Sequence, residues 1–449
     1  MKALLLSTLL LTLFISANAG AKVSALFHPY DDTFSAIVER MKDAESRIDM
    51  ALYNIDASKR NPIIAHISSR AVQKKLSTGE LKIRLLFEGY ESKEKNIEKM
   101  NKLEALGIDV RFVGSSKKMH HKFAVIDGNS SSSSVITGSA NWSMASKRNY
   151  NENILFFDRE EVVANNFQKE FNTLWSIAKE IGRVGKYKHQ NIEKDNSSET
   201  QVFFNMDNFR IKNNRLYKAK GRGWALTKKI VKAIDAADSH LQIATTRIKL
   251  RPIYNAIKRA AGRGVKVDLV VTMGQYEYQS KRRKMKELPC ANEYEKSCST
   301  SKNFSVLLSR DNFEGSENVT VRLKVFNVRK AAYLTKQMHS KYMIVDDEIL
   351  YTGSFNWSYS AEFNHIENVV RLERAFNPSV VNSFTSDFNT LFSLERNLYR
   401  GFVRKLDGAL EKGRKISCSF TPMSLTFEEI DRIVNAGRKF KVSTTRACK

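Results

Sequence analysis

The chain has 449 residues, 42% of them hydrophobic, a composition that excludes wholesale disorder and a length that predicts at least two domains. Its 74 Lys and Arg residues outnumber 48 Asp and Glu residues, and the formal net charge of +26 predicts a surface that attracts polyanions, either nucleic acid or anionic lipid. After the N-terminal segment, no apolar run reaches the ~18 residues of a membrane-spanning helix.

The N-terminus has the pattern of an export signal. Lys2 precedes an apolar run that ends near Ile15, and Ala17-Asn18-Ala19 offers a small-x-small cleavage site. We therefore expect residues 1–19 to be a signal peptide. The mature protein should be soluble and exported, to the periplasm or the extracellular space.

Helical and strand patterns follow one another in the same order in two parts of the chain. In residues 20–185, helical patterns at 37–44 and 63–75 alternate with strand patterns at 48–51, 82–87 and 108–113. In residues 223–400, helical patterns at 229–236 and 253–261 alternate with strand patterns at 241–244, 266–271 and 319–323. Each part ends in a helix with a Phe-x-x-x-Phe pattern, starting at Phe167 and Phe384. The repeat predicts two α/β halves in which helices cover a sheet.

Each half also carries the pattern His-x-Lys-x-x-x-x-Asp, followed by Gly-Ser-x-Asn-Trp-Ser. In a strand, alternate side chains share a face, so His120 lies beside Lys122 and His339 beside Lys341. Two histidines and two lysines supply what phosphodiester cleavage needs without a metal: a nucleophile, a proton donor and fixed positive charge. We expect no cofactor and no metal in this chemistry.

These motifs resemble the phospholipase D superfamily, also called the HKD family. The resemblance includes Asn149-x-x-Glu152-Asn153 and Asn364-x-x-Glu367-Asn368, and the first copy is most similar to the subgroup of bacterial HKD endonucleases and mitochondrial cardiolipin hydrolase. It implies an α/β fold of two pseudo-symmetric α/β/α sandwich halves whose motif strands meet at a shared central site. Since one chain carries both motifs, we expect a monomer without an obligate protein partner.

The resemblance also implies roles for the motif residues. One of His120 and His339 attacks phosphorus and the other protonates the leaving oxygen, but the sequence leaves open which is the nucleophile. Glu152 and Glu367 orient the histidines, and the residues that bind the phosphate oxygens are Lys122, Lys341, Ser139, Asn141, Ser354 and Asn356. Asp127 and Asp346 are read as structural. The other histidines are expected on the surface or in satisfied packing: His28, His66, His121, His189, His240 and His365.

Three segments fall outside the repeat. Residues 186–222 are predicted to be a linker, and 401–449 a C-terminal appendage with a capping box at Thr426 and Glu429. The second half contains an insertion, 274–318, whose basic cluster either contacts the substrate or is a solvated face: Lys281, Arg282, Arg283, Lys284 and Lys286.

The four cysteines agree with an oxidising compartment and predict disulfides. Proximity in sequence favours Cys290 with Cys298 and Cys418 with Cys448, although three pairings are possible. No Cys-x-x-Cys spacing is present, so zinc is not expected at the cysteines.

Three substrates remain open. The lead interpretation is an exported phospholipase D that hydrolyses phospholipid, since two motifs share one chain and the positive charge suits anionic bilayers. The alternative is a metal-independent endonuclease acting on DNA or RNA. A phosphatidyltransferase such as cardiolipin synthase is third.

Overall fold

The computed structural model describes residues 22–88, 94–113, 117–128, 130–180, 200–220, 223–272, 292–294, 316–325, 337–394, 396–412 and 423–432. The proposed signal peptide, the basic cluster of the insertion and all four cysteines lie outside the described residues. Predictions about export, that cluster and disulfides therefore rest on the sequence alone.

The first half is built on one sheet. Its strands are β1 (Lys22–His28), β2 (Arg47–Leu52), β3 (Lys82–Phe87), β4 (Ile108–Val113), β6 (Lys122–Ile126), β7 (Ser134–Gly138), β8 (Tyr150–Asp158) and β9 (Ala178–Glu180). They lie side by side in the order β1-β8-β7-β6-β2-β3-β4-β9. Its helices are α1 (Thr33–Lys42), α2 (Pro62–Ile67), α3 (Arg70–Thr78), α4 (Glu94–Glu104), α5 (Met144–Asn149) and α6 (Glu161–Ile177).

The second half repeats this plan. Its sheet contains β10 (Gln201–Phe204), β13 (His240–Thr245), β15 (Lys266–Thr272), β16 (Val319–Val325), β18 (Lys341–Val345), β19 (Ile349–Gly353), β22 (Asn368–Glu373) and β23 (Met423–Leu425). The order is β10-β22-β19-β18-β13-β15-β16-β23. Its helices are α7 (Ala225–Asp235), α8 (Arg251–Gly262), α12 (Tyr359–Asn364), α13 (Pro378–Ser393) and α14 (Arg396–Glu411).

The two sheets correspond strand for strand. In each, three neighbouring strands are parallel and lie between antiparallel strands, and the HKD strands β6 and β18 lie beside β2 and β13. The predicted α/β class and the pseudo-symmetric halves are confirmed. The helix predicted at 63–75 is divided in two, because Ser69 caps a new helix by accepting a hydrogen bond from the Val72 N–H.

Two edge strands come from segments that sequence reasoning had placed outside the halves. β10 lies in the predicted linker, and β23 lies in the predicted C-terminal appendage. In the repeat, β10 corresponds to β1 and β23 to β9. The capping box forms, with Thr426 Oγ1 accepting from the Glu429 N–H and Glu429 Oε2 accepting from the Thr426 N–H. Short edge strands carry little apolar periodicity, so the sequence did not reveal them.

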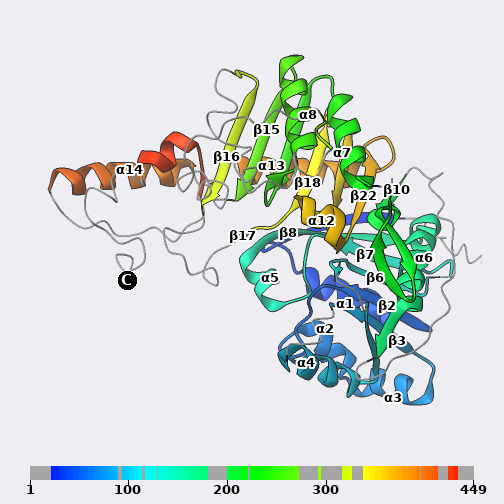
Figure 1. Ribbon diagram of the computed structural model, residues 1–449. Coiled ribbons are helices and arrows are strands. Elements are labelled where there is room, and N and C mark those ends of the chain that lie inside the picture. The colour runs from blue at the N-terminus through cyan, green and yellow to red at the C-terminus, as the bar shows by residue number, and fades with distance from the viewer. Residues whose placement is uncertain are drawn as a thin grey trace, which may run out of the picture.

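The halves share a core. One cluster of buried residues joins the inner faces of both sheets and the apolar faces of α6 and α13, including Phe167, Phe171, Phe384 and Phe388. The opposite face of each sheet is covered by its own helices, α1 to α4 in one half and α7 and α8 in the other. Figure 1 shows the two halves with the HKD strands β6 and β18 on the sides that face each other. The packing fixes the motifs of both halves in one rigid body.

The HKD segments are not the continuous strands that alternation predicted. β5 (Lys118–Met119) pairs with β21 (His365–Ile366) of the other half, whereas β6 begins at Lys122 and pairs with β2. In the second copy β17 (Gln337–Met338) pairs with β8, whereas β18 begins at Lys341 and pairs with β13. Each histidine therefore lies between a short strand that pairs with the other half and a longer strand that pairs within its own sheet.

Among the described helices, none is both long enough and apolar enough to cross a bilayer.

Candidate active site

Both motif histidines are attached to the opposite half by their backbone. The His120 N–H donates to the Ile366 carbonyl at 3.1 Å, and the His339 N–H donates to the Asn151 carbonyl at 3.0 Å. Asn151 and Ile366 occupy equivalent positions, each one residue before the motif glutamate. The interface therefore places each histidine next to the glutamate of the other half.

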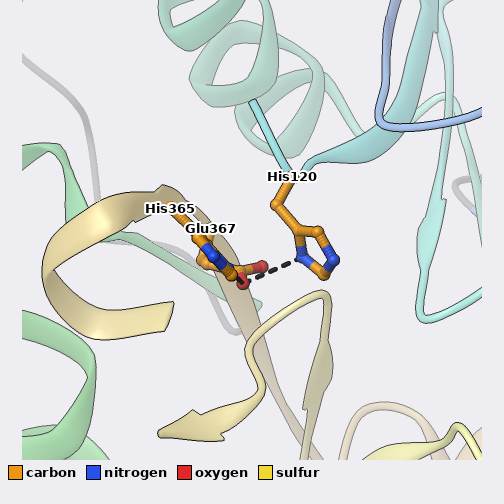
Figure 2. Close-up of side chains that lie close together, drawn as sticks. All are labelled: His120, His365 and Glu367. Atoms are coloured by element: carbon orange, nitrogen blue, oxygen red, sulfur yellow. Dashed lines mark ion pairs between the residues drawn. The ribbon is translucent and has the colours of Figure 1, made fainter. Parts of the chain in front are cut away.

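The glutamates are exchanged between the halves. His120 Nδ1 lies 2.9 Å from Glu367 Oε1 (Figure 2), and His339 Nδ1 contacts Glu152 Oε1. Both glutamate side chains are fully buried. A carboxylate at Nδ1 orients the ring and leaves Nε2 for chemistry, as the acid of a catalytic triad does. The predicted acids are thus brought to the histidines, each to the histidine of the other motif.

Each glutamate also contacts a second histidine. His365 Nδ1 lies 3.5 Å from Glu367 Oε1, and its ring centroid is 5.2 Å from that of His120. His28 Nδ1 lies 3.6 Å from Glu152 Oε2, and its Nε2 lies 2.5 Å from Thr33 Oγ1.

The sequence predicts His28 and His365 on the surface or in ordinary packing, and it does not indicate their contacts with Glu152 and Glu367. A signal existed for His365, because it lies two residues before Glu367 in extended chain and shares its face. For His28 no local signal existed, since only the pairing of β1 with β8 brings it to Glu152.

The two lysines lie beside the histidines. Lys122 Nζ donates to the His120 carbonyl at 2.7 Å and lies 3.3 Å from His120 Nδ1, while Lys341 Nζ donates to the His339 carbonyl. Burial, only partly offset by the nearby glutamates, lowers the pKa of Lys122 to about 8 and that of Lys341 to about 7. At pH 7 Lys122 is therefore mostly charged, whereas Lys341 is close to half charged.

Burial also decides the charge of the histidines. It lowers the pKa of His120 to about 3 and that of His339 to about 4, so both rings are neutral at pH 7 without a ligand. Burial alone would raise the pKa of Glu152 and Glu367, but the contacts with their histidine partners outweigh it and lower the pKa of both carboxyl groups. A bound phosphodiester anion would favour a protonated ring.

The serines predicted to bind phosphate make positioning contacts. Ser139 Oγ accepts from the Asn153 N–H and Ser354 Oγ accepts from the Asn368 N–H, each at 3.0 Å. These bonds fix the segments that carry Glu152 and Glu367. Asn141 Oδ1 is buried and has no hydrogen-bond partner among the described residues. Phosphate binding by Ser139, Asn141, Ser354 and Asn356 stays a prediction.

The motif aspartates brace the sheets. Asp127 accepts from the backbone N–H groups of Glu45, Ser46 and Arg47, and Asp346 accepts from those of Asp238, Ser239 and His240. These bonds tie the turn after each HKD strand to the start of its neighbour.

The remaining motif side chains pack inside the halves. Trp142 and Trp357 are buried in separate cores. His121 is buried between Glu170 and Asn368, as expected of a satisfied packing residue.

One group of side chains has the composition of a metal site. Within the described part of the chain, one ligand atom from each of His120, His365 and Glu367 lies within 4.8 Å of the others (Figure 2).

Comparisons with known proteins agree with this geometry. The family model described as "Cardiolipin synthase, PLD-like domain" matches residues 37–175 and 230–392. Mitochondrial cardiolipin hydrolase of Xenopus laevis is 45% identical over 73 residues, which are 16% of this chain and 32% of that protein. The Danio rerio protein of the same name is 26% identical over 152 residues, 34% of this chain and 60% of that protein.

The chain therefore spans 32% of the length of the first of these relatives and 60% of the second. Among solved structures, phosphatidylserine synthase of Haemophilus influenzae Rd KW20 is similar over 93% of each chain, with a TM-score of 0.55 and 12% identity. At this identity the likeness concerns the fold alone.

Proposed function

Because this chain belongs to the phospholipase D-like family, we propose that it is a phosphodiesterase that works through a covalent phosphohistidine. The observation that carries the proposal is the exchanged pairing, His120 with Glu367 and His339 with Glu152. Each ring is held at Nδ1 and presents Nε2, so two imidazoles are available to one phosphate.

The proposed cycle has two steps. In the first, Nε2 of one histidine attacks phosphorus, and the leaving oxygen takes the P–O electron pair and a proton from the other histidine. In the second, that histidine removes a proton from water, the water oxygen attacks phosphorus, and the N–P bond electrons return to the first ring. Lys122 and Lys341 stabilise the charge on the nonbridging oxygens.

The lead substrate is a phospholipid. The matched family is described by cardiolipin chemistry, the two relatives cited above are named cardiolipin hydrolases, and a charge of +26 suits an anionic membrane surface. The test incubates purified protein with liposomes of increasing anionic fraction and measures release of the head group. Absence of release, with supercoiled plasmid nicked under the same conditions, would favour the second candidate.

That second candidate is a metal-independent endonuclease, and the observation that favours it is the same excess of Lys and Arg. Parallel incubations with supercoiled plasmid, single-stranded DNA and RNA distinguish an endonuclease from a phospholipase D. Transfer to an alcohol in place of water is distinguished by adding glycerol to the liposome reaction and measuring the phosphatidyl product.

Two further proposals follow from the chain itself. Export to the periplasm or the extracellular space rests on the N-terminal pattern, and N-terminal sequencing of the mature protein tests cleavage after Ala19. A monomer is sufficient because one chain supplies both histidines and both glutamates. Sedimentation equilibrium tests this, and activity restricted to a dimer would contradict it.

A further inference from the structure

The two half-sites differ in which second histidine accompanies the glutamate. His28 is fully buried and its Nε2 is engaged by Thr33, whereas the His365 side chain is 17% exposed. The repeat position of His365 in the first half is Tyr150, whose ring centroid lies 5.8 Å from that of His339. Only around His120 does the pair of imidazoles have access to solvent.

The atoms around Glu367 are incompletely satisfied. Both Glu367 carboxylate oxygens and His365 Nδ1 are buried, and none makes a hydrogen bond of good geometry within the described residues. Glu367 Oε1 approaches His120 Nδ1 at 2.9 Å without the geometry of a hydrogen bond. Buried polar atoms without partners are rare in native proteins and suggest a ligand.

We propose that His120, Glu367 and His365 bind one divalent transition-metal ion of the Zn²⁺ class, and that the bound ion inhibits the enzyme. Two imidazoles and a carboxylate are ligands that Zn²⁺ prefers, whereas Mg²⁺ prefers an all-oxygen shell.

The spacing of the ligand atoms fits such an ion. Ligands of a tetrahedral Zn²⁺ with bonds near 2.1 Å lie about 3.3 Å apart. The contacts of Glu367 Oε1 with the two rings, 2.9 and 3.5 Å, bracket that value, and all three ligand atoms lie within 4.8 Å of one another.

Inhibition rests on the proposed function. An ion on His120 Nδ1 and Glu367 removes the carboxylate that orients the ring and withdraws electron density from the imidazole. His120 then neither attacks phosphorus nor exchanges a proton at Nε2 efficiently. The ion is thus an inhibitor and plays no part in the catalytic cycle.

Metal binding is tested without an activity assay. The full chain, stripped with EDTA and dialysed, is titrated with Co²⁺ while visible absorption is recorded, and Zn²⁺ is then added as a competitor. We expect one ion per chain. His365→Tyr, which introduces the side chain of the other half-site, should weaken binding by about 10- to 100-fold.

His240→Gln is the matched control, because His240 contacts Asp268 on another strand pair and should leave the affinity unchanged. Equal melting temperatures of the three proteins show that folding is not the cause. Absence of stoichiometric Co²⁺ binding in the wild type, or equal affinity in wild type and His365→Tyr, would overturn the site.

A second arm addresses inhibition. Micromolar Zn²⁺ should reduce phosphodiesterase turnover of the wild type and EDTA should restore it, while His365→Tyr keeps its own turnover in Zn²⁺. If one ion bound per chain and turnover did not change, the proposed inhibition would be refuted and the metal site would still be supported. If the protein shows no turnover on any phosphodiester, the proposed function fails, and the Co²⁺ titration still decides the site.

Discussion

The half-site around His120 and the half-site around His339 share one plan and differ in their surroundings. Each joins a histidine of one half to a glutamate of the other, and each adds a second histidine. Around His339 that second imidazole is sealed in the protein, and around His120 it reaches solvent. The comparison shows that both half-sites keep the pair of histidine and glutamate, whereas the contacts around each pair differ.

The difference extends to the aromatic neighbours. The ring centroid of Tyr53 lies 4.6 Å from that of His120, and Lys122 Nζ lies 5.2 Å from the Tyr53 ring centroid. Its repeat position in the second half is Thr246, which has no ring. Lys341 instead has Arg247 nearby, whose charge contributes to its lower pKa. The two motif lysines therefore have different cationic and aromatic neighbours.

The largest expected effect tests whether both half-sites belong to one cycle. His120→Ala and His339→Ala should each reduce kcat by on the order of 10⁴-fold or more, because each removes one of two obligatory groups. The double variant should be no worse than either single one. Steady-state and single-turnover rates check this, and substantial turnover in either variant would show that the halves act separately.

The exchanged pairing is tested by the glutamates. Glu367→Gln and Glu152→Gln should each lower kcat by on the order of 10²- to 10³-fold, since the amide no longer stabilises the charged ring. Glu367→Gln should be coupled to His120, lowering the pKa of that ring because a charged carboxylate no longer lies at its Nδ1. Glu152→Gln should show that coupling with His339. NMR titration of the histidine ring signals measures it, and coupling within each motif in place of across the motifs would contradict the geometry.

The lysines provide the pH dependence. A lysine is charged below its pKa, so with values of about 8 for Lys122 and about 7 for Lys341 the free enzyme loses phosphate-binding charge as pH rises through 7 to 8. kcat/KM should fall on this alkaline side.

Arginine substitutions separate the two lysines. Lys341→Arg should move the alkaline limb upward because a guanidinium stays charged, and Lys122→Arg should move it less. Profiles of kcat/KM between pH 5 and pH 10, the range that spans both values, provide the measurement. If the alkaline decrease of kcat/KM stayed at the same pH in both variants, a group other than these two lysines would be responsible for it.

The smallest effect concerns the aspartates. Asp127 is 5% exposed, and Asp346 makes the same bonds at a more exposed position. Asp127→Ala should lower the free energy of unfolding by about 2–3 kcal/mol and Asp346→Ala by about 1–2 kcal/mol, since unsatisfied N–H groups cost more when buried. Urea unfolding checks this. Loss of turnover in a variant of unchanged stability would assign the aspartate a role in catalysis.

Much of this protein could be predicted from its sequence. The repeat, the α/β class and most strands and helices near their observed bounds followed from local periodicity, and the motifs with their family resemblance indicated the residues proposed as catalytic. These features depend on contacts within a few residues, which alternation and helical period record directly.

The tertiary structure alone decided the rest. In the folded protein each motif histidine contacts the glutamate of the other motif, and His28 and His365 also contact these carboxylates. Each HKD strand begins only after its histidine, and β10 and β23 form edges of the second sheet. In a near-symmetric repeat, both pairings of histidine and glutamate satisfy the same motif. Only the packing of one sheet against the other determines which carboxylate reaches which ring, because that contact joins residues about two hundred positions apart and leaves no period in the chain.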